Sequence, residues 1–161
     1  MNGTAMPYGR TTFGIALVIA FVMGLAISPL AHQVVSRAHA AAAPLAPAVI
    51  DLAALRHDDL PKTSNPEMNT RMLVVTDNAT VQVQSGNVKK HVHPRTDEIQ
   101  YIIEGTGAMW LGNERKEFKP GTIIIIPKGT AHAGTLVSSG PVKALAIKIP
   151  PQPPDDTVYV D

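Results

Sequence analysis

A single all-β domain is the fold class that this sequence of 161 residues predicts. Short runs of β-branched residues recur between turn-forming residues from about residue 70 onwards, which is typical of β-barrels and β-sandwiches. Gly112-Asn113 lies between two of these runs and is a two-residue hairpin signal. The 121 residues that remain after the first 40 of the 161 are enough for one β-barrel domain and too few for two.

The predicted strands follow one another with short connections, at residues 72–76, 80–84, 88–93, 99–103, 108–111, 115–118, 122–126 and 142–149. The isoleucine run 123–126 has no polar alternation, so we expect both faces of that strand to be covered. Met109 and Trp110 lie on opposite faces of one strand, and aromatic packing favours Trp110 in the core. Prolines supply no backbone donors for pairing, so residues 151–161 are predicted to form an extended Pro-rich tail.

The first 40 residues predict a targeting segment. Residues 11–31 are almost wholly apolar, Arg10 precedes them, and Ala38-His39-Ala40 is a small-x-small cleavage pattern. We therefore expect residues 1–40 to be a signal peptide and the protein to be periplasmic or secreted. Residues 13–31 are long enough to cross a bilayer, so anchoring in the membrane by an uncleaved segment is the alternative.

Residues 41–69 are predicted to form a linker and an N-terminal arm. The Ala/Pro-rich start is an extended tether, and residues 49–60 are expected to lie against the barrel or against a partner subunit. Without residues 1–40, which hold Arg10 and Arg37, 12 of the 14 basic residues remain against 13 acidic ones, so nothing suggests nucleic acid as a partner. The chain has no cysteine, so its stability must come from the core and from any bound metal.

Three histidines and one glutamate are the candidate metal ligands. His91 and His93 are two residues apart, so their side chains point to the same side of a strand. Glu98 follows at an odd offset, but the connection at residues 94–97 lets the chain reverse and set Glu98 on a neighbouring strand opposite His93. His132 arrives from a later strand. Three imidazoles and a carboxylate can together hold one divalent ion.

Asp97 is the rival carboxylate. Glu98 is favoured because it begins the apolar run 99–103 and has the longer side chain, while Asp97 suits the end of a turn. If Glu98 points inward, Gln100 and Ile102 do as well. Gln100 is then either a donor to the ligands or to substrate, or an ordinary cross-strand polar contact. Glu98 and Gln100 are the candidate catalytic residues.

The spacing of these residues resembles two motifs of the cupin superfamily, in particular its single-domain, type-2-like members. The first motif is met by Gly86, His91, His93, Glu98 and Gly105, and the second by Gly121, Pro127, Gly129 and His132. Leu136 stands where the second motif has asparagine. The resemblance covers residues 70–150 and implies a double-stranded β-helix, or jelly-roll barrel, with one metal ion held by His91, His93, Glu98 and His132.

The resemblance also implies a class of function. The metal would be Fe, Mn, Ni, Cu or Zn, with coordination positions left open for a small-molecule substrate or ligand. We expect an exported metal-dependent enzyme with dioxygenase-like or other oxidoreductive activity on a small organic molecule. A non-catalytic, metal-bearing module that binds or senses a small molecule is the alternative. Related cupins commonly pair, so a homodimer is also expected.

Overall fold

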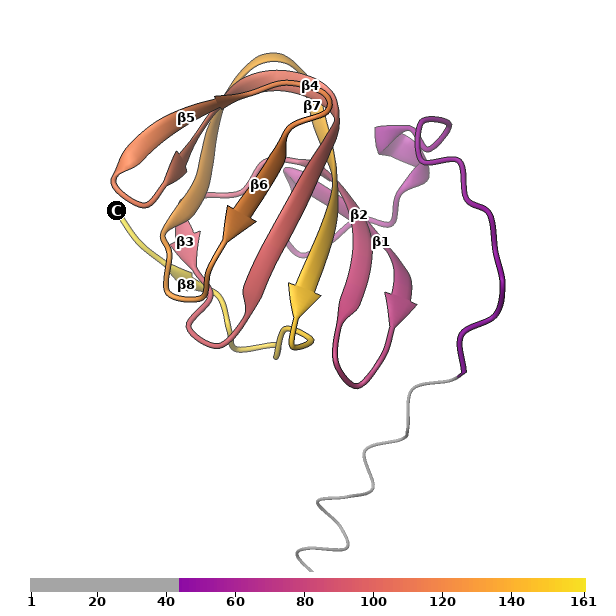
Figure 1. Cartoon of the computed structure of the whole chain (residues 1–161). Coiled ribbons are helices and arrows are strands. Elements are labelled where there is room, and N and C mark those ends of the chain that lie inside the picture. The colour runs from indigo at the N-terminus through magenta and orange to yellow at the C-terminus, as the bar shows by residue number, and fades with distance from the viewer. Residues whose placement is uncertain (1–43) are drawn as a thin grey trace, which may run out of the picture. The chain divides into compact units, whose positions relative to one another are not determined.

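The computed structural model describes residues 44–161, which form one antiparallel sheet of eight strands that curves into a barrel (Figure 1). Its helical content is a single turn of 3-10 helix, η1, at His57–Asp59. Among the described residues, no helix has the length and apolarity that a membrane crossing requires. The predicted signal peptide or anchor at residues 1–40 lies outside the described residues.

The strands are β1 Met68–Val75, β2 Thr80–Gly86, β3 His91–Val92, β4 Asp97–Leu111, β5 Glu114–Phe118, β6 Ile123–Ile126, β7 His132–Ile149 and β8 Val158–Tyr159. Along the sheet they are ordered β1-β2-β7-β3-β8, and β4 pairs with β5, β6 and β7. The two runs predicted at 99–103 and 108–111 are parts of one strand, β4. It bends through register shifts near Gly105 without ending there. These long, bent strands close the barrel around its interior.

The core follows the expected alternation of side chains. Ile102 and Met109 of β4 are buried, and they pack with Phe118, Ile124 and Ala144 from three other strands. The barrel prediction and the inward orientation of Ile102 are therefore confirmed.

The prediction that Trp110 lies in the core was wrong. Its neighbour Met109 takes the inward position, so Trp110 faces outward on the next position of the strand. Lys90 Nζ and Arg115 Cζ each lie 4.7 Å from the centroid of the Trp110 ring. The indole is therefore covered by two cationic side chains and not by the apolar core side chains that were expected around it.

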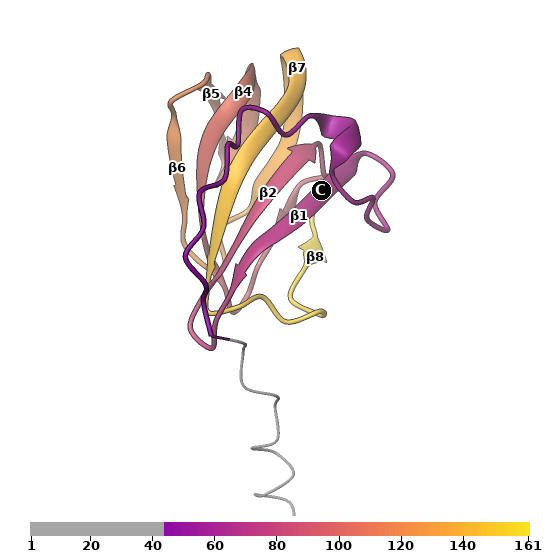
Figure 2. The ribbon, with the colours of Figure 1, turned by 90° about the vertical axis from the view of Figure 1, so that its right-hand side faces the viewer.

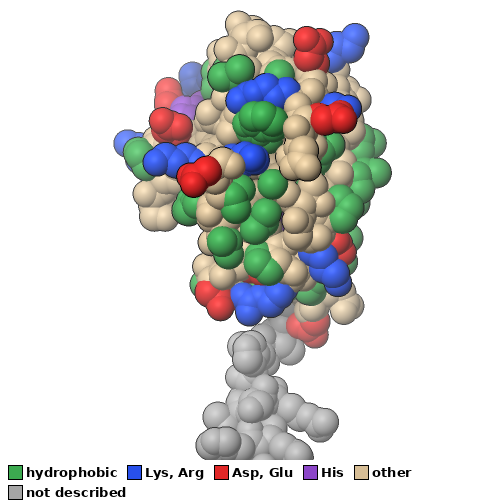
Figure 3. Space-filling model, turned by 90° about the vertical axis from the view of Figure 1, so that its left-hand side faces the viewer, with side chains coloured by type: hydrophobic (Ala, Val, Ile, Leu, Met, Phe, Trp, Pro, Cys, Tyr) green, Lys and Arg blue, Asp and Glu red, His purple; other side chains and the backbone are tan. Residues whose placement is uncertain are grey.

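The prediction that both faces of the isoleucine run are covered was also wrong. Ile124 and Ile126 are buried, whereas Ile123 and Ile125 are 63% and 65% exposed. The reason is topological, because β6 pairs with β4 alone and nothing in residues 44–161 packs on its outer face. Hydrophobic side chains also gather in patches among Lys, Arg, Asp and Glu on the side of the molecule drawn in Figure 3.

The N-terminal arm lies against the barrel, beside β2 and β7 (Figure 2). Lys143 of β7 is 2% exposed and its ammonium donates to the Leu55 carbonyl oxygen at 2.9 Å. Glu104 Oε2 lies 3.0 Å from the same nitrogen. His57 Nδ1 lies 3.1 Å from the hydroxyl of Ser85 on β2. Residues 49–60 were expected to lie against the barrel or against a partner subunit. The contacts of Leu55 and His57 show that this part of the segment lies against the barrel.

Candidate metal centre

Three imidazoles meet inside the barrel. His91 on β3 pairs directly with His132 at the start of β7, and His93 follows β3 on the same side. The ring centroids are 4.3 Å apart for His91 and His132, 4.7 Å for His91 and His93, and 5.1 Å for His93 and His132. All three side chains are buried, and their ligand atoms lie within 4.8 Å of one another. The cluster is compatible with one metal ion.

The backbone determines the tautomer of each ring. The Nδ1 atoms of His91, His93 and His132 lie 2.8, 2.8 and 2.9 Å from the carbonyl oxygens of Lys89, Asp156 and Thr130. A carbonyl oxygen only accepts hydrogen bonds, so each Nδ1 carries the proton and each Nε2 presents a lone pair. The Nε2 atoms of His91 and His93 then face each other at 3.3 Å without a proton between them. Metal-bound histidines have this arrangement.

Glu98 adds a carboxylate to the same point. Its Oε2 lies 3.2 Å from His93 Nε2 and 3.6 Å from His132 Nε2, and the side chain is 3% exposed. Burial works against the charged form of Glu98, whereas Lys148 and Gln100, which lie beside its two carboxylate oxygens, hold its pKa down. Glu98 is therefore a carboxylate at neutral pH.

Burial, together with the nearby His132, lowers the pKa of the His91 imidazole to about 4. The hydrogen bond to the Lys89 carbonyl raises that pKa but does not offset the lowering. His91 is therefore neutral at neutral pH, as a metal ligand must be. His132 Nε2 is buried and has no hydrogen-bond partner in residues 44–161. Buried acceptors that converge without a proton repel one another unless a cation lies between them. The donor set thus fits a divalent metal ion, and the role of Glu98 as its fourth ligand stays a prediction.

The remaining predicted residues lie close by. Gln100 Nε2 donates to Glu98 Oε1 at 2.9 Å, so Gln100 lies where a donor to a ligand was expected. Asp97 Oδ1 accepts from the Lys128 backbone N–H at 2.8 Å, at the turn, outside the cluster. Glu98 was expected on a neighbouring strand opposite His93, and it does lie opposite His93, but its strand does not pair with β3. Strand β4 pairs with β5, β6 and β7, and Glu98 reaches His93 across the barrel interior.

The C-terminal tail also differs from the prediction of an unpaired extended segment. Strand β8 pairs with β3, so Tyr159 lies beside His91. The Asp156 carboxylate is fully buried and accepts from the backbone N–H and the Nε–H of Arg95, both at 3.0 Å. Gln152 Nε2 lies 3.1 Å from His93 Nδ1, but its bond to Thr157 Oγ1 is shorter, at 2.8 Å. Prolines occur only at the start of the tail. The β-branched and aromatic residues Val158-Tyr159-Val160 were the sequence signal for a paired strand.

The cluster opens into a cavity of about 310 Å³, a size typical of small-molecule sites. Beyond the predicted residues, its lining includes Gln84, Lys148, Gln152, Thr157 and Tyr159. Sequence reasoning missed Lys148, although alternation with the inward Ala144 and Ala146 places it on the inner face of β7.

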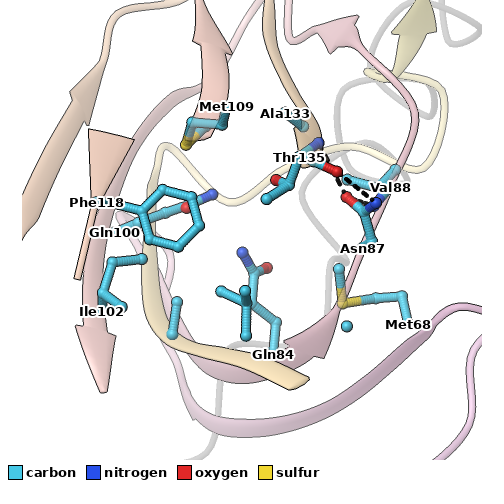
Figure 4. Close-up of a pocket in the computed structure, with 13 residues that line it drawn as sticks. Met68, Gln84, Asn87, Val88, Gln100, Ile102, Met109, Phe118, Ala133 and Thr135 are labelled. Carbon is cyan, nitrogen blue, oxygen red and sulfur yellow. Dashed lines mark hydrogen bonds between the residues drawn. The ribbon is translucent and has the colours of Figure 1, made fainter. Parts of the chain in front are cut away.

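A second, smaller cavity of about 40 Å³ shares Gln84 and Gln100 with the first and lies among the apolar core side chains. In Figure 4 the side chains of Gln84 and Gln100 point toward its centre, Phe118, Ile102 and Met109 lie on one side of it, and Asn87 and Thr135 lie on the other. The barrel interior therefore combines a polar site around the histidines with a smaller cavity of mixed lining.

Comparison with known proteins gives the same fold. Residues 78–148 match the family model described as Cupin domain, which confirms the resemblance. The uncharacterized protein MJ1618 of Methanocaldococcus jannaschii is 42% identical over 71 residues, which are 44% of this chain and 57% of that protein. This chain thus matches little more than half the length of that relative.

Solved structures with the same fold include three from bacteria. Pac13 of Streptomyces, described as a nucleoside dehydratase, is 17% identical with a TM-score of 0.53, over 65% of this chain and 88% of Pac13. KdgF of a Halomonas species is 18% identical with a TM-score of 0.50, over 55% and 85% of the two chains. BH2720 of Bacillus halodurans is 25% identical with a TM-score of 0.53, over 74% and 92%.

Proposed function

Given that residues 78–148 of this chain are a cupin domain, we propose that the protein is a metal-dependent enzyme that acts on a small organic molecule with oxygenase-like or other oxidoreductive chemistry. The observation that carries this proposal is the convergence of three Nε2 lone pairs and the Glu98 carboxylate beside a cavity of about 310 Å³. Such a site leaves room for a molecule next to the ion.

Each residue of the centre has a defined task in this proposal. His91, His93 and His132 would hold a divalent ion through Nε2, because their Nδ1–H groups are bonded to backbone carbonyls. A bound ion would supply Lewis acidity and, where it is redox active, one-electron chemistry with dioxygen as the oxidant. Glu98 would be the fourth ligand, and its carboxylate would be the group that accepts a proton, while Gln100 orients that carboxylate through its bond to Oε1.

Polar groups beyond the four ligands favour an enzyme over a binding module. Lys148 and Tyr159 both line the cavity and both carry exchangeable protons. The alternative, a module that binds or senses a small molecule, has the same metal and the same cavity but needs no group that transfers a proton. Pac13, described as a nucleoside dehydratase, shows that this fold takes small-molecule substrates. At 17% identity that likeness concerns the fold, so no nucleoside is proposed for this chain.

Export is part of the proposal and rests on the sequence. The apolar segment 11–31 and Ala38-His39-Ala40 favour a cleaved signal peptide, so mature periplasmic or secreted protein should begin at Ala41. N-terminal sequencing that finds Met1 on membrane-bound protein would support the anchored alternative. Metal taken up outside the cytoplasm follows intrinsic affinity, which for nitrogen-rich sites favours Cu²⁺ and Zn²⁺.

A homodimer is proposed as well. Ile123, Ile125 and Tyr101 leave a cluster of exposed apolar side chains on the outer face of β6 and β4. Such clusters often mark protein interfaces.

Oxygen uptake tests the enzymatic part of the proposal. Protein loaded separately with Fe²⁺, Mn²⁺, Cu²⁺ and Zn²⁺ would be assayed with a panel of small phenols, enediols and carboxylic acids. We expect uptake that depends on both substrate and a redox-active ion, and no uptake with Zn²⁺. Saturable binding without turnover in every metal form would favour the binding module.

A further inference from the structure

Lys148 places a positive charge beside the metal centre, although an ammonium cannot itself be a metal ligand. It lies on β7, opposite Glu98 in the register of β4 and β7, and it is 9% exposed. Its Nζ is 3.9 Å from Glu98 Oε2, a distance that suits an ion pair and is too long for a hydrogen bond. The ammonium donates to Gln152 Oε1, which accounts for one of its three N–H bonds within residues 44–161.

The charges around the cavity are unequal once an ion is bound. Among the described residues that line it, Lys148 is the one ammonium and Glu98 the one carboxylate. A divalent ion coordinated by Glu98 already outweighs that carboxylate, so Lys148 leaves a further positive charge without a counter-charge. An ammonium that is largely removed from water is costly unless an anion pairs with it. The occupied site therefore favours a ligand that brings negative charge.

The shape of the interior restricts the rest of the ligand. The smaller cavity, which Ile102, Met109 and Phe118 line on one side and Asn87 and Thr135 on the other, has a volume of about 40 Å³, and one water needs roughly 10–15 Å³ of such volume. It has room for a short aliphatic group and not for a ring system. Gln84 and Gln100 lie at the junction of the two cavities, where they can meet polar atoms of the ligand.

We propose that Lys148 binds the carboxylate of a small aliphatic acid. The short aliphatic chain enters the smaller cavity. This inference rests on the proposed function, because it names the substrate class of the same site. Gln152 holds the ammonium in place through its Oε1.

Calorimetric titration of the Co²⁺-loaded full chain tests this assignment with a matched pair of probes, 2-oxobutanoate and its neutral amide, 2-oxobutanamide. We expect wild type to bind the acid more tightly than the amide. A charge-assisted hydrogen bond contributes about 1.5–3 kcal/mol, so Lys148→Met should weaken acid binding by roughly tenfold or more and leave amide binding nearly unchanged. Lys119→Met, which removes an exposed lysine outside the cavity, should leave both affinities unchanged.

Equal affinity of wild type for acid and amide would overturn the assignment, whichever variants fold. Full acid affinity in Lys148→Met, or an equal loss for both probes, would do the same. Lys148→Gln serves as the neutral variant if the methionine variant does not fold. The Co²⁺ content of wild type separates the two proposals. A chain that takes up no metal contradicts the metal-dependent function, whereas a loaded chain that fails the probe test contradicts only the role of Lys148.

Discussion

The backbone carbonyl oxygen of Asp156 accepts the Nδ1–H of His93 at 2.8 Å, although 63 residues separate the two in the sequence. The bond fixes the tautomer of His93 and aims its Nε2 at the centre of the cluster. The buried Asp156 carboxylate accepts two hydrogen bonds from Arg95, so the tail is tied to the loop that follows His93. One residue of the tail thereby positions a candidate metal ligand.

Asp156→Ala should weaken metal binding without removing a ligand. The variant loses both bonds to Arg95 and lets the tail move away from His93. Loss of a partner that orients a metal ligand typically costs about 10–100-fold in metal affinity, which competition with a chromophoric chelator would measure. Asp155→Ala is the control, because the Asp155 side chain is 78% exposed and contacts the same arginine. Equal metal affinities in the two variants would show that Asp156 does not position His93.

Glu98→Gln and Asp97→Asn decide which carboxylate is a ligand. Glu98 faces His93 and His132, whereas Asp97 bonds to the Lys128 backbone. We expect Glu98→Gln to lose most of its bound metal, because an amide oxygen carries no charge, and Asp97→Asn to keep it. Elemental analysis of the purified variants gives the metal content directly. The reverse pattern would make Asp97 the ligand.

The metal-free protein should lose stability as the pH falls below 6.5. The pKa of His91 is lowered from 6.5 to about 4 in the folded state, so between these values protons bind preferentially to the unfolded chain. One pKa unit corresponds to about 1.4 kcal/mol, so the loss attributable to His91 reaches up to about 3 kcal/mol near pH 4 and grows no further below it. Urea denaturation of wild type and His91→Gln measures this difference. A pH dependence that is the same in both would contradict the assignment to His91.

Ile125→Glu should abolish the proposed homodimer and leave the barrel folded. Ile125 is 65% exposed on a strand that pairs on one side only, so the glutamate stays in water in a single chain and enters an apolar interface in a dimer. Light scattering coupled to gel filtration would report the masses. A wild-type monomer, or a dimeric variant, would place any interface elsewhere.

The sequence predicted the barrel and the four converging side chains because both depend on local patterns. His91 and His93 share a face by strand alternation, and the glycines around them mark turns. Gly86 illustrates the second point, since its φ is +128° and a Cβ there would lie 1.8 Å from the Glu67 carbonyl oxygen. Both signals are properties of a few neighbouring residues.

The predictions that were wrong or missing all concern contacts between segments that are distant in the sequence. Alternation shows that Met109 and Trp110 face opposite ways but not which of them is inside, and it cannot show that no other part of residues 44–161 packs on Ile123 and Ile125. The pairing of the tail with β3 had a local signal in Val158-Tyr159-Val160, but the contact of Asp156 with His93 has none. Lys148 was missed because a lysine is usually solvated, whereas here its partners are Glu98, across the sheet, and Gln152, in the tail.

Metal titration of the wild-type chain, followed by X-ray absorption at the metal edge, tests the central claim most directly. The arrangement of His91, His93 and His132 beside Glu98 predicts one divalent ion per chain, with three imidazole nitrogens and one carboxylate oxygen among its neighbours. A chain that binds no Fe²⁺, Mn²⁺, Ni²⁺, Cu²⁺ or Zn²⁺, or an ion whose neighbours include fewer than three imidazoles, would contradict it.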